Sequence, residues 1–148
     1  MATNLVYRNS DSQNRVEDLG ETLAPGVAVL STAILPAVTV TGSADYTIED
    51  TTSYAPLTIS DIPAGGVGLT DQEVTLAFDG TWEFAEDDVA GTIAATMTQG
   101  LLIYADETAV GAATLTTTSS GNTLWGYVDI PKDYDVSREM VPIRIGAL

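Results

Sequence analysis

The chain of 148 residues contains no cysteine and no histidine. The absence of cysteine excludes disulfide bonds and thiolate chemistry. The absence of histidine removes the commonest general base and the commonest metal ligand. Cations are also scarce, because five lysines and arginines accompany 21 aspartates and glutamates and leave a net charge of −16. A surface this acidic repels nucleic acid and anionic membranes, so we expect neither as a partner.

Long apolar runs are absent as well. The most apolar stretch, residues 23–40, is interrupted by Pro25 and Pro36 and does not have the pattern of a membrane span. The first residues, MATNLVYRNSDSQ, lack a basic region followed by an apolar one, so we expect no secretion signal. Threonine and valine, which favour strands, are abundant, and no helical pattern exceeds two turns. The fold class is therefore predicted to be all-β.

The predicted organisation is one compact sandwich or barrel-like domain over residues 21–148, preceded by an extended N-terminal arm over residues 1–20. The arm is polar and keeps neither a strand period nor a helix period, so we do not expect it to build the core. It is either a disordered terminus or a segment that becomes ordered on a neighbouring subunit. Two of the five cations lie in it, which favours the second interpretation. The candidate partner-binding residues of the arm are Leu5, Val6, Tyr7, Arg8 and Arg15.

Residues 73–84, EVTLAFDGTWEF, carry the clearest strand pattern. Apolar residues and Gly80 occupy the even positions, and polar or small residues occupy the odd ones. Because side chains alternate between faces along a strand, this predicts one long strand with Gly80 at a bend or bulge. A tight hairpin at Asp79-Gly80 is the alternative, and it would move Trp82 and Phe84 to the other face.

Short strands follow at regular spacing toward the C-terminus, as in sandwiches and barrels. The strand predicted over residues 123–130 is apolar on both faces, with Leu124 and Val128 on one face and Trp125 and Tyr127 on the other. Such a strand is either central in its sheet or placed at a subunit contact. Trp125 and Tyr127 are therefore candidates for a subunit interface.

Motifs that carry catalysis are missing from the sequence. There is no GxSxG, P-loop or dinucleotide-binding fingerprint, and no base for a catalytic triad. Adjacent acids such as Asp87-Asp88 are interpreted as a solvated face rather than a glycosidase pair. Asp133-Tyr134-Asp135 begins like a calcium loop but lacks its later glycine and glutamate. We expect no enzyme activity, no metal and no cofactor.

The two tryptophans leave one binding function open. Trp82 and Trp125 could stack on sugars, as in a carbohydrate-binding or host-surface-binding module. Each lies in a strand with other apolar residues, which favours a position in the core or at an interface instead.

Six stretches of the chain form a recognisable set: GVGLTD at 66–71, VTLAFDGTWEF at 74–84, GLLIYAD at 100–106, LTTT at 115–118, GNTLWGYV at 121–128 and VPIRI at 141–145. Considered together, they resemble a family of small capsid decoration (cement) proteins of tailed bacteriophages, a family once described as recombinase-like. The opening MATNLVYR is also similar to the start of that family. Between Thr41 and Pro63 the chain departs from the family's shorter pattern.

The resemblance implies a structural protein of the virion. Members of the family are β-rich and assemble as trimers on the outer surface of an icosahedral head. There they clamp neighbouring major capsid subunits against the pressure of the packaged DNA. The expected partners are accordingly the major capsid protein and further copies of this chain, and the expected location is the capsid exterior, after synthesis in the host cytoplasm.

Overall fold

The computed structural model describes residues 14–43, 69–90, 97–106 and 109–146. For five short strands outside these ranges it describes the backbone alone. These are β1 (Leu5–Tyr7), β5 (Thr47–Glu49), β6 (Ser53–Tyr54), β7 (Leu57–Thr58) and β8 (Asp61–Pro63). The described chain is almost entirely strand, with only two short 3₁₀ helices, η1 (Glu86–Asp88) and η2 (Val136–Arg138). The prediction of an all-β fold is confirmed.

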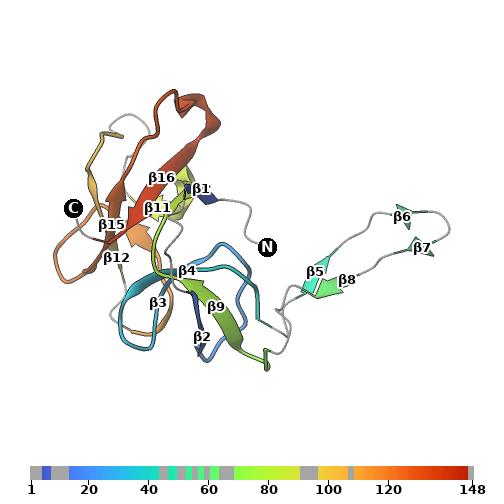
Figure 1. The fold of residues 1–148 in the computed structure, drawn as a ribbon. Coiled ribbons are helices and arrows are strands. Elements are labelled where there is room, and N and C mark those ends of the chain that lie inside the picture. Colours follow the sequence, from blue (N-terminus) through green and yellow to red (C-terminus); the bar gives the residue numbers. More distant parts are fainter. Residues whose placement is uncertain are drawn as a thin grey trace.

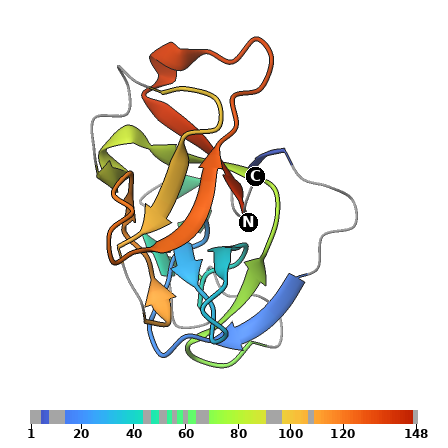
Figure 2. The same cartoon turned by 90° about the vertical axis from the view of Figure 1, so that its left-hand side faces the viewer.

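The larger sheet, sheet A, has seven strands and curls into a half-barrel (Figures 1 and 2). Its neighbours pair antiparallel, except that β11 runs parallel to β14. The strand order is β1, β10 (Thr81–Ala85), β16 (Met140–Ile145), β15 (Thr123–Val128), β12 (Leu102–Ala105), β14 (Leu115–Thr116) and β11 (Val89–Ala90).

The smaller sheet, sheet B, has five antiparallel strands. Their order is β13 (Gly111–Ala112), β3 (Ala28–Leu30), β4 (Pro36–Thr39), β9 (Glu73–Ala77) and β2 (Asn14–Asp18). The remaining strands pair as two small ladders, β5 with β8 and β6 with β7. Figure 1 shows these ladders projecting away from the two sheets.

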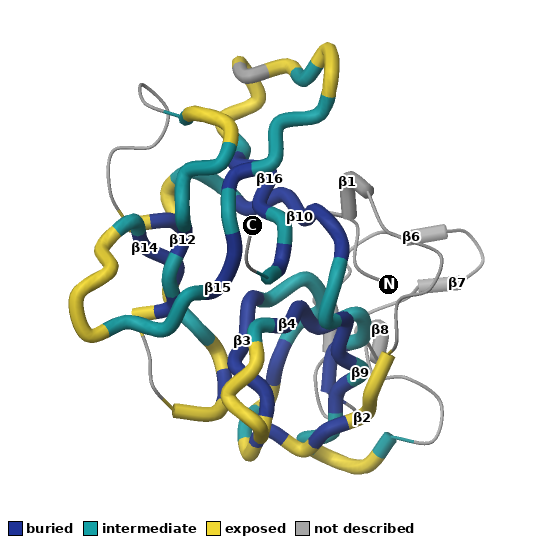
Figure 3. The backbone as a smooth tube through the Cα atoms, turned by 60° about the vertical axis from the view of Figure 1, so that its left-hand side comes forward, coloured by how far each residue is buried: buried dark blue, intermediate teal, exposed yellow. Residues whose placement is uncertain are grey.

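The main core lies between the sheets. Sheet A contributes large residues such as Trp82, Trp125 and Ile143, and sheet B contributes Leu30 and Val38. A second buried cluster covers the opposite face of sheet B, where Leu19 and Leu23 pack with Val29, Ala37, Val74 and Leu76. Sheet B is therefore apolar on both faces, and Figure 3 shows burial concentrated in the strands of the two sheets.

The chain changes sheets within the stretch 73–84. Strand β9 pairs with β2 and β4 in sheet B, whereas β10 pairs with β1 and β16 in sheet A. Buried Gly80 has a φ of 97°, a conformation that glycine adopts without strain, and the Trp82 indole donates a hydrogen bond to the Asp79 carbonyl at 2.9 Å. The bend at Gly80 is present, but neither one continuous strand nor the alternative hairpin is formed. The expected single apolar face is also wrong, because Val74 packs in the second cluster and Trp82 in the main core.

The second half of the predicted arm belongs to the body of the protein. Strand β2 pairs with β9 over five residues, and Leu19 is buried in the second cluster. The buried Glu17 accepts hydrogen bonds from the backbone N–H and the hydroxyl of Thr32 at 2.7 and 2.9 Å. The expectation that residues 1–20 build none of the core is therefore wrong for residues 14–20.

A β-bulge on β15 explains why Trp125 lies in the core. Ile103 is opposite Gly126, but the next residue of β12, Tyr104, is opposite Leu124, so Trp125 is an extra residue without a partner on β12. The bulge reverses the alternation locally, and Trp125 then shares the core with Val128. The sequence analysis placed Trp125 on the same face of the strand as Tyr127 and on the opposite face from Val128. Because of the bulge, that assignment is wrong.

Gly126 sits beside this bulge at a point where the backbone of β16 approaches closely. A Cβ atom at position 126 would overlap the carbonyl oxygen of Arg144 and lie 3.3 Å from Cγ2 of Ile143. Because backbone atoms cannot move aside as a flexible side chain can, only glycine fits here.

We predict that Gly126→Ala lowers the free energy of unfolding by roughly 2–3 kcal/mol, as overpacking a core does. The control is Gly121→Ala, where φ is 82° but no heavy atom lies within 4 Å of the added Cβ; its backbone strain costs about 1 kcal/mol. Urea denaturation compares the two variants. A Gly126→Ala protein as stable as the control would show that β16 does not approach as described.

Candidate functional site

Trp125 and Trp82 are core residues. Trp125 is fully buried, donates its indole N–H to the Val29 carbonyl at 3.2 Å, and meets Phe84 edge-to-face at 5.5 Å between ring centroids and 88° between planes. Trp82 is 1% exposed. The predicted interface role of Trp125 is therefore wrong, and neither indole presents a face on which a sugar could stack.

Tyr127 lies on β15 between Leu102 of β12 and Arg144 of β16, and its side chain is half-buried. Of the two alternatives for this strand, the structure shows the central position, since β15 has a neighbour on each side. A subunit contact through Tyr127 stays a prediction.

The structure describes the five residues predicted to bind a partner through the arm to different extents. Arg15 pairs with Glu17 and places its guanidinium carbon 5.0 Å from the centroid of the Phe78 ring, although half of its side chain is exposed. Its charge is thus partly neutralised within the chain. The backbone of Leu5–Tyr7 pairs with β10 at the edge of sheet A, and the side chains of these residues, like Arg8 as a whole, lie outside the described residues. Partner contact by the five arm residues stays a prediction.

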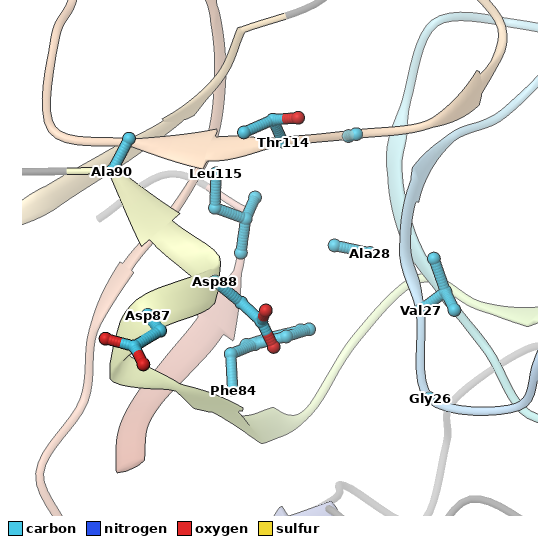
Figure 4. Close-up of a pocket in the computed structure, with 10 residues that line it drawn as sticks. Gly26, Val27, Ala28, Phe84, Asp87, Asp88, Ala90, Thr114 and Leu115 are labelled. Atoms are coloured by element: carbon cyan, nitrogen blue, oxygen red, sulfur yellow. The ribbon is translucent and has the colours of Figure 1, made fainter. Parts of the chain in front are cut away.

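A cleft of about 470 Å³ opens between the two sheets (Figure 4). Its floor is apolar, with Ala28 of β3, Phe84 of β10 and Leu115 of β14 all buried. Its rim carries Asp87 and Asp88 of η1, both exposed. In Figure 4 the Asp88 side chain points into the cleft, whereas Asp87 points away from it. The arrangement joins an apolar floor to negative charge at the entrance.

A second hollow of about 350 Å³ also borders η1. Glu86, Asp87 and Glu139 line it together with Ala85, so its charged groups are all carboxylates. The backbone N–H of Glu86 donates to the Glu139 carbonyl at 2.9 Å, which ties η1 to the end of η2. Asp87 lines both hollows, and η1 therefore forms an acidic ridge between them.

A separate polar cluster joins β10 to the loop between β15 and β16. Arg138 binds the buried carboxylate of Glu83 with two hydrogen bonds, at 2.6 and 3.0 Å. The Tyr134 hydroxyl donates to the same carboxylate at 2.8 Å. Burial and this hydrogen bond raise the pKa of Tyr134 well above its usual value. The cluster satisfies a charge on a strand otherwise packed in the core.

Asp135, next to Tyr134, has a structural role that the sequence did not reveal. Asp135 accepts hydrogen bonds from the N–H and hydroxyl of Ser137 at 3.0 and 2.7 Å and so caps η2. These two hydrogen bonds lower the pKa of Asp135. Within the described ranges, no group of three or more acidic side chains is arranged to hold a metal ion.

Comparison of the chain with protein-family models, with curated proteins and with solved structures gave no match. Among the residues that the structure describes, no helix has the length and apolar character needed to cross a membrane.

We predict that Tyr134→Phe changes how stability depends on pH. Because the folded pKa of Tyr134 lies above the unfolded value of about 10, its stabilising effect is complete below that pH and is lost as pH rises toward the folded pKa. The stability difference between wild type and variant should shrink from pH 8 to pH 11, measured by urea denaturation.

The matched control is Tyr127→Phe, because the Tyr127 hydroxyl has no hydrogen-bond partner among the described side chains and backbone groups. At pH 8 this variant should lose less stability than Tyr134→Phe does. A Tyr134→Phe difference that stays constant over the same range would contradict the assigned hydrogen bond.

Proposed function

We propose that this protein is a capsid decoration protein of a tailed bacteriophage. In this role it binds the outer surface of the head as a homotrimer, stabilises contacts between major capsid subunits and makes or breaks no covalent bond. The observation that supports this most is the placement of the stretches that carry the family resemblance. Five of them reach β10, β12, β14, β15 and β16, which are neighbouring strands of sheet A, and the stretch 74–84 also covers β9 of sheet B. The resemblance thus includes five adjacent strands of one sheet.

The surface of sheet B offers features suited to adhesion. Strand β2 is at the edge of this sheet, and edge strands are places where an added strand can pair. Among the described residues, the exposed large apolar side chains also belong to this sheet or its loops: Val16, Ile34, Leu35 and Val110. Weak contacts of this kind act together when many copies cover one lattice.

The net charge fits the same role. A net charge of −16 per copy keeps a crowded shell of the protein soluble. Attachment of the protein to a head would then depend on specific contacts and not only on the attraction between its negative surface and positive charge on the head.

The proposal is tested with particles of the virus that encodes the protein, prepared with and without it. We expect stoichiometric amounts of the protein in purified particles. We also expect heads that lack it to release DNA at a lower temperature, followed by dye fluorescence during heating. Equal release temperatures would show that the protein does not clamp the head.

The arm is tested with two deletions that differ in where they end. Removing residues 1–13 leaves β2 and Leu19 in place, so we expect a folded protein that no longer attaches to heads. Removing residues 1–20 takes away the edge strand and a buried leucine, and the protein should lose at least about 2 kcal/mol of stability. Sedimentation with heads and thermal unfolding measure the two effects. Full attachment of the shorter deletion would remove any role for the arm.

A further inference from the structure

The cleft between the sheets carries negative charge at its rim that no described lysine or arginine of this chain neutralises. Every residue that lines it lies between positions 26 and 115, and the sequence contains no lysine or arginine between positions 16 and 131. The described arginines pair with acids elsewhere: Arg15 with Glu17, Arg138 with Glu83 and Arg144 with Asp129. Within the described part of the chain, Asp87 and Asp88 form no ion pair.

The edges of both sheets flank this cleft. Ala90 belongs to β11, the last strand of sheet A, and Ala113 directly follows β13, the last strand of sheet B. An edge strand presents unpaired backbone groups, which an extended segment of another chain can bind. The surroundings of the cleft thus suit a peptide backbone better than a compact small molecule.

We propose that this cleft binds an extended basic segment of a partner protein. One apolar side chain of the segment enters the cleft and packs on Phe84 and Leu115. Lysine or arginine side chains on either side of it lie against Asp88 and, across the ridge, in the hollow formed by Glu86, Asp87 and Glu139. A second copy of this chain does not suit the cleft, because no two of its lysines and arginines lie within five positions of each other and it has no such basic segment to offer.

The binding is measured on the isolated protein, so its outcome is independent of the proposed role on a head. The probe is a five-residue peptide that alternates lysine and leucine, titrated calorimetrically at low salt. A lysine–serine peptide of the same charge tests the apolar floor. We expect saturable one-site binding of the lysine–leucine peptide and binding at least about tenfold weaker for the lysine–serine peptide.

The variants separate the cleft from the general negative field of the surface. Asp87→Asn with Asp88→Asn should weaken binding about tenfold or more, as loss of charge-assisted contacts does. The control is Asp71→Asn with Asp133→Asn, which removes the same charge at two exposed positions outside the cleft and should weaken binding about twofold at most. Ala90→Lys, at an exposed position on the rim, should abolish binding because it supplies the missing cation within the chain.

Three results would overturn the proposal. The first is equal weakening by the two double variants, which would assign the binding to net charge alone. The second is equal affinity for the leucine and serine peptides, which would leave the cleft floor without a role. The third is the absence of saturable binding by the wild-type protein. Circular dichroism of each variant confirms that it is folded before the titration.

Discussion

The structure depends on the apolar contact between its two sheets. Each sheet is built from strands that lie far apart in the sequence. Trp82, Trp125 and Phe84 of sheet A pack against Leu30 and Val38 of sheet B, and nearly all of these side chains are fully buried. Burial of aromatic side chains of this size contributes on the order of 2–3 kcal/mol each. The indole N–H of Trp125 crosses the interface to the Val29 carbonyl, so the packing also fixes one sheet relative to the other. With neither disulfide nor metal ligand chemistry from cysteine and histidine, this core is what holds the fold.

Negative charge is the second constraint, and the fold distributes it unevenly. The two buried glutamates have partners that lie next to them in space. Glu83 binds Arg138 and Tyr134, and Glu17 binds Thr32 and Arg15. Leaving such a carboxylate without partners would cost several kcal/mol. Arg15, Arg138 and Arg144 thus pair with acids of their own chain. On η1, the exposed Asp87 and Asp88 form no ion pair within the described part of the chain.

The sequence predicted the fold class well because strand periodicity and turn residues are local signals. It could not show which sheet a strand joins, and so the stretch 73–84 was expected in one strand although Gly80 sends its halves into two sheets. The bulge at Trp125 was not predicted, because one inserted residue reverses which face of the strand each side chain occupies and no residue type in the sequence marks it. Residues 14–20 were assigned to an arm because NRVED is polar, but an edge strand is held by its backbone. The hydrogen-bond partner of the buried Glu17 is Thr32, 15 positions away in the sequence. The Asp87-Asp88 pair was noticed in the sequence, but its place above Phe84, Ala28 and Leu115 is a product of the tertiary structure.

The two packed sheets form the body of the protein, and we propose that its sheet edges, acidic ridge and exposed apolar residues make the contacts with its partners. The central claim is that it acts by adhesion on the outside of a viral head. The most direct test is a cryo-electron-microscopy reconstruction of heads from the virus that encodes it. We expect density for the two-sheet body, in trimers, on the outer capsid surface over the junctions of major capsid subunits. Heads with no such density, from particles in which the protein is produced normally, would contradict the account.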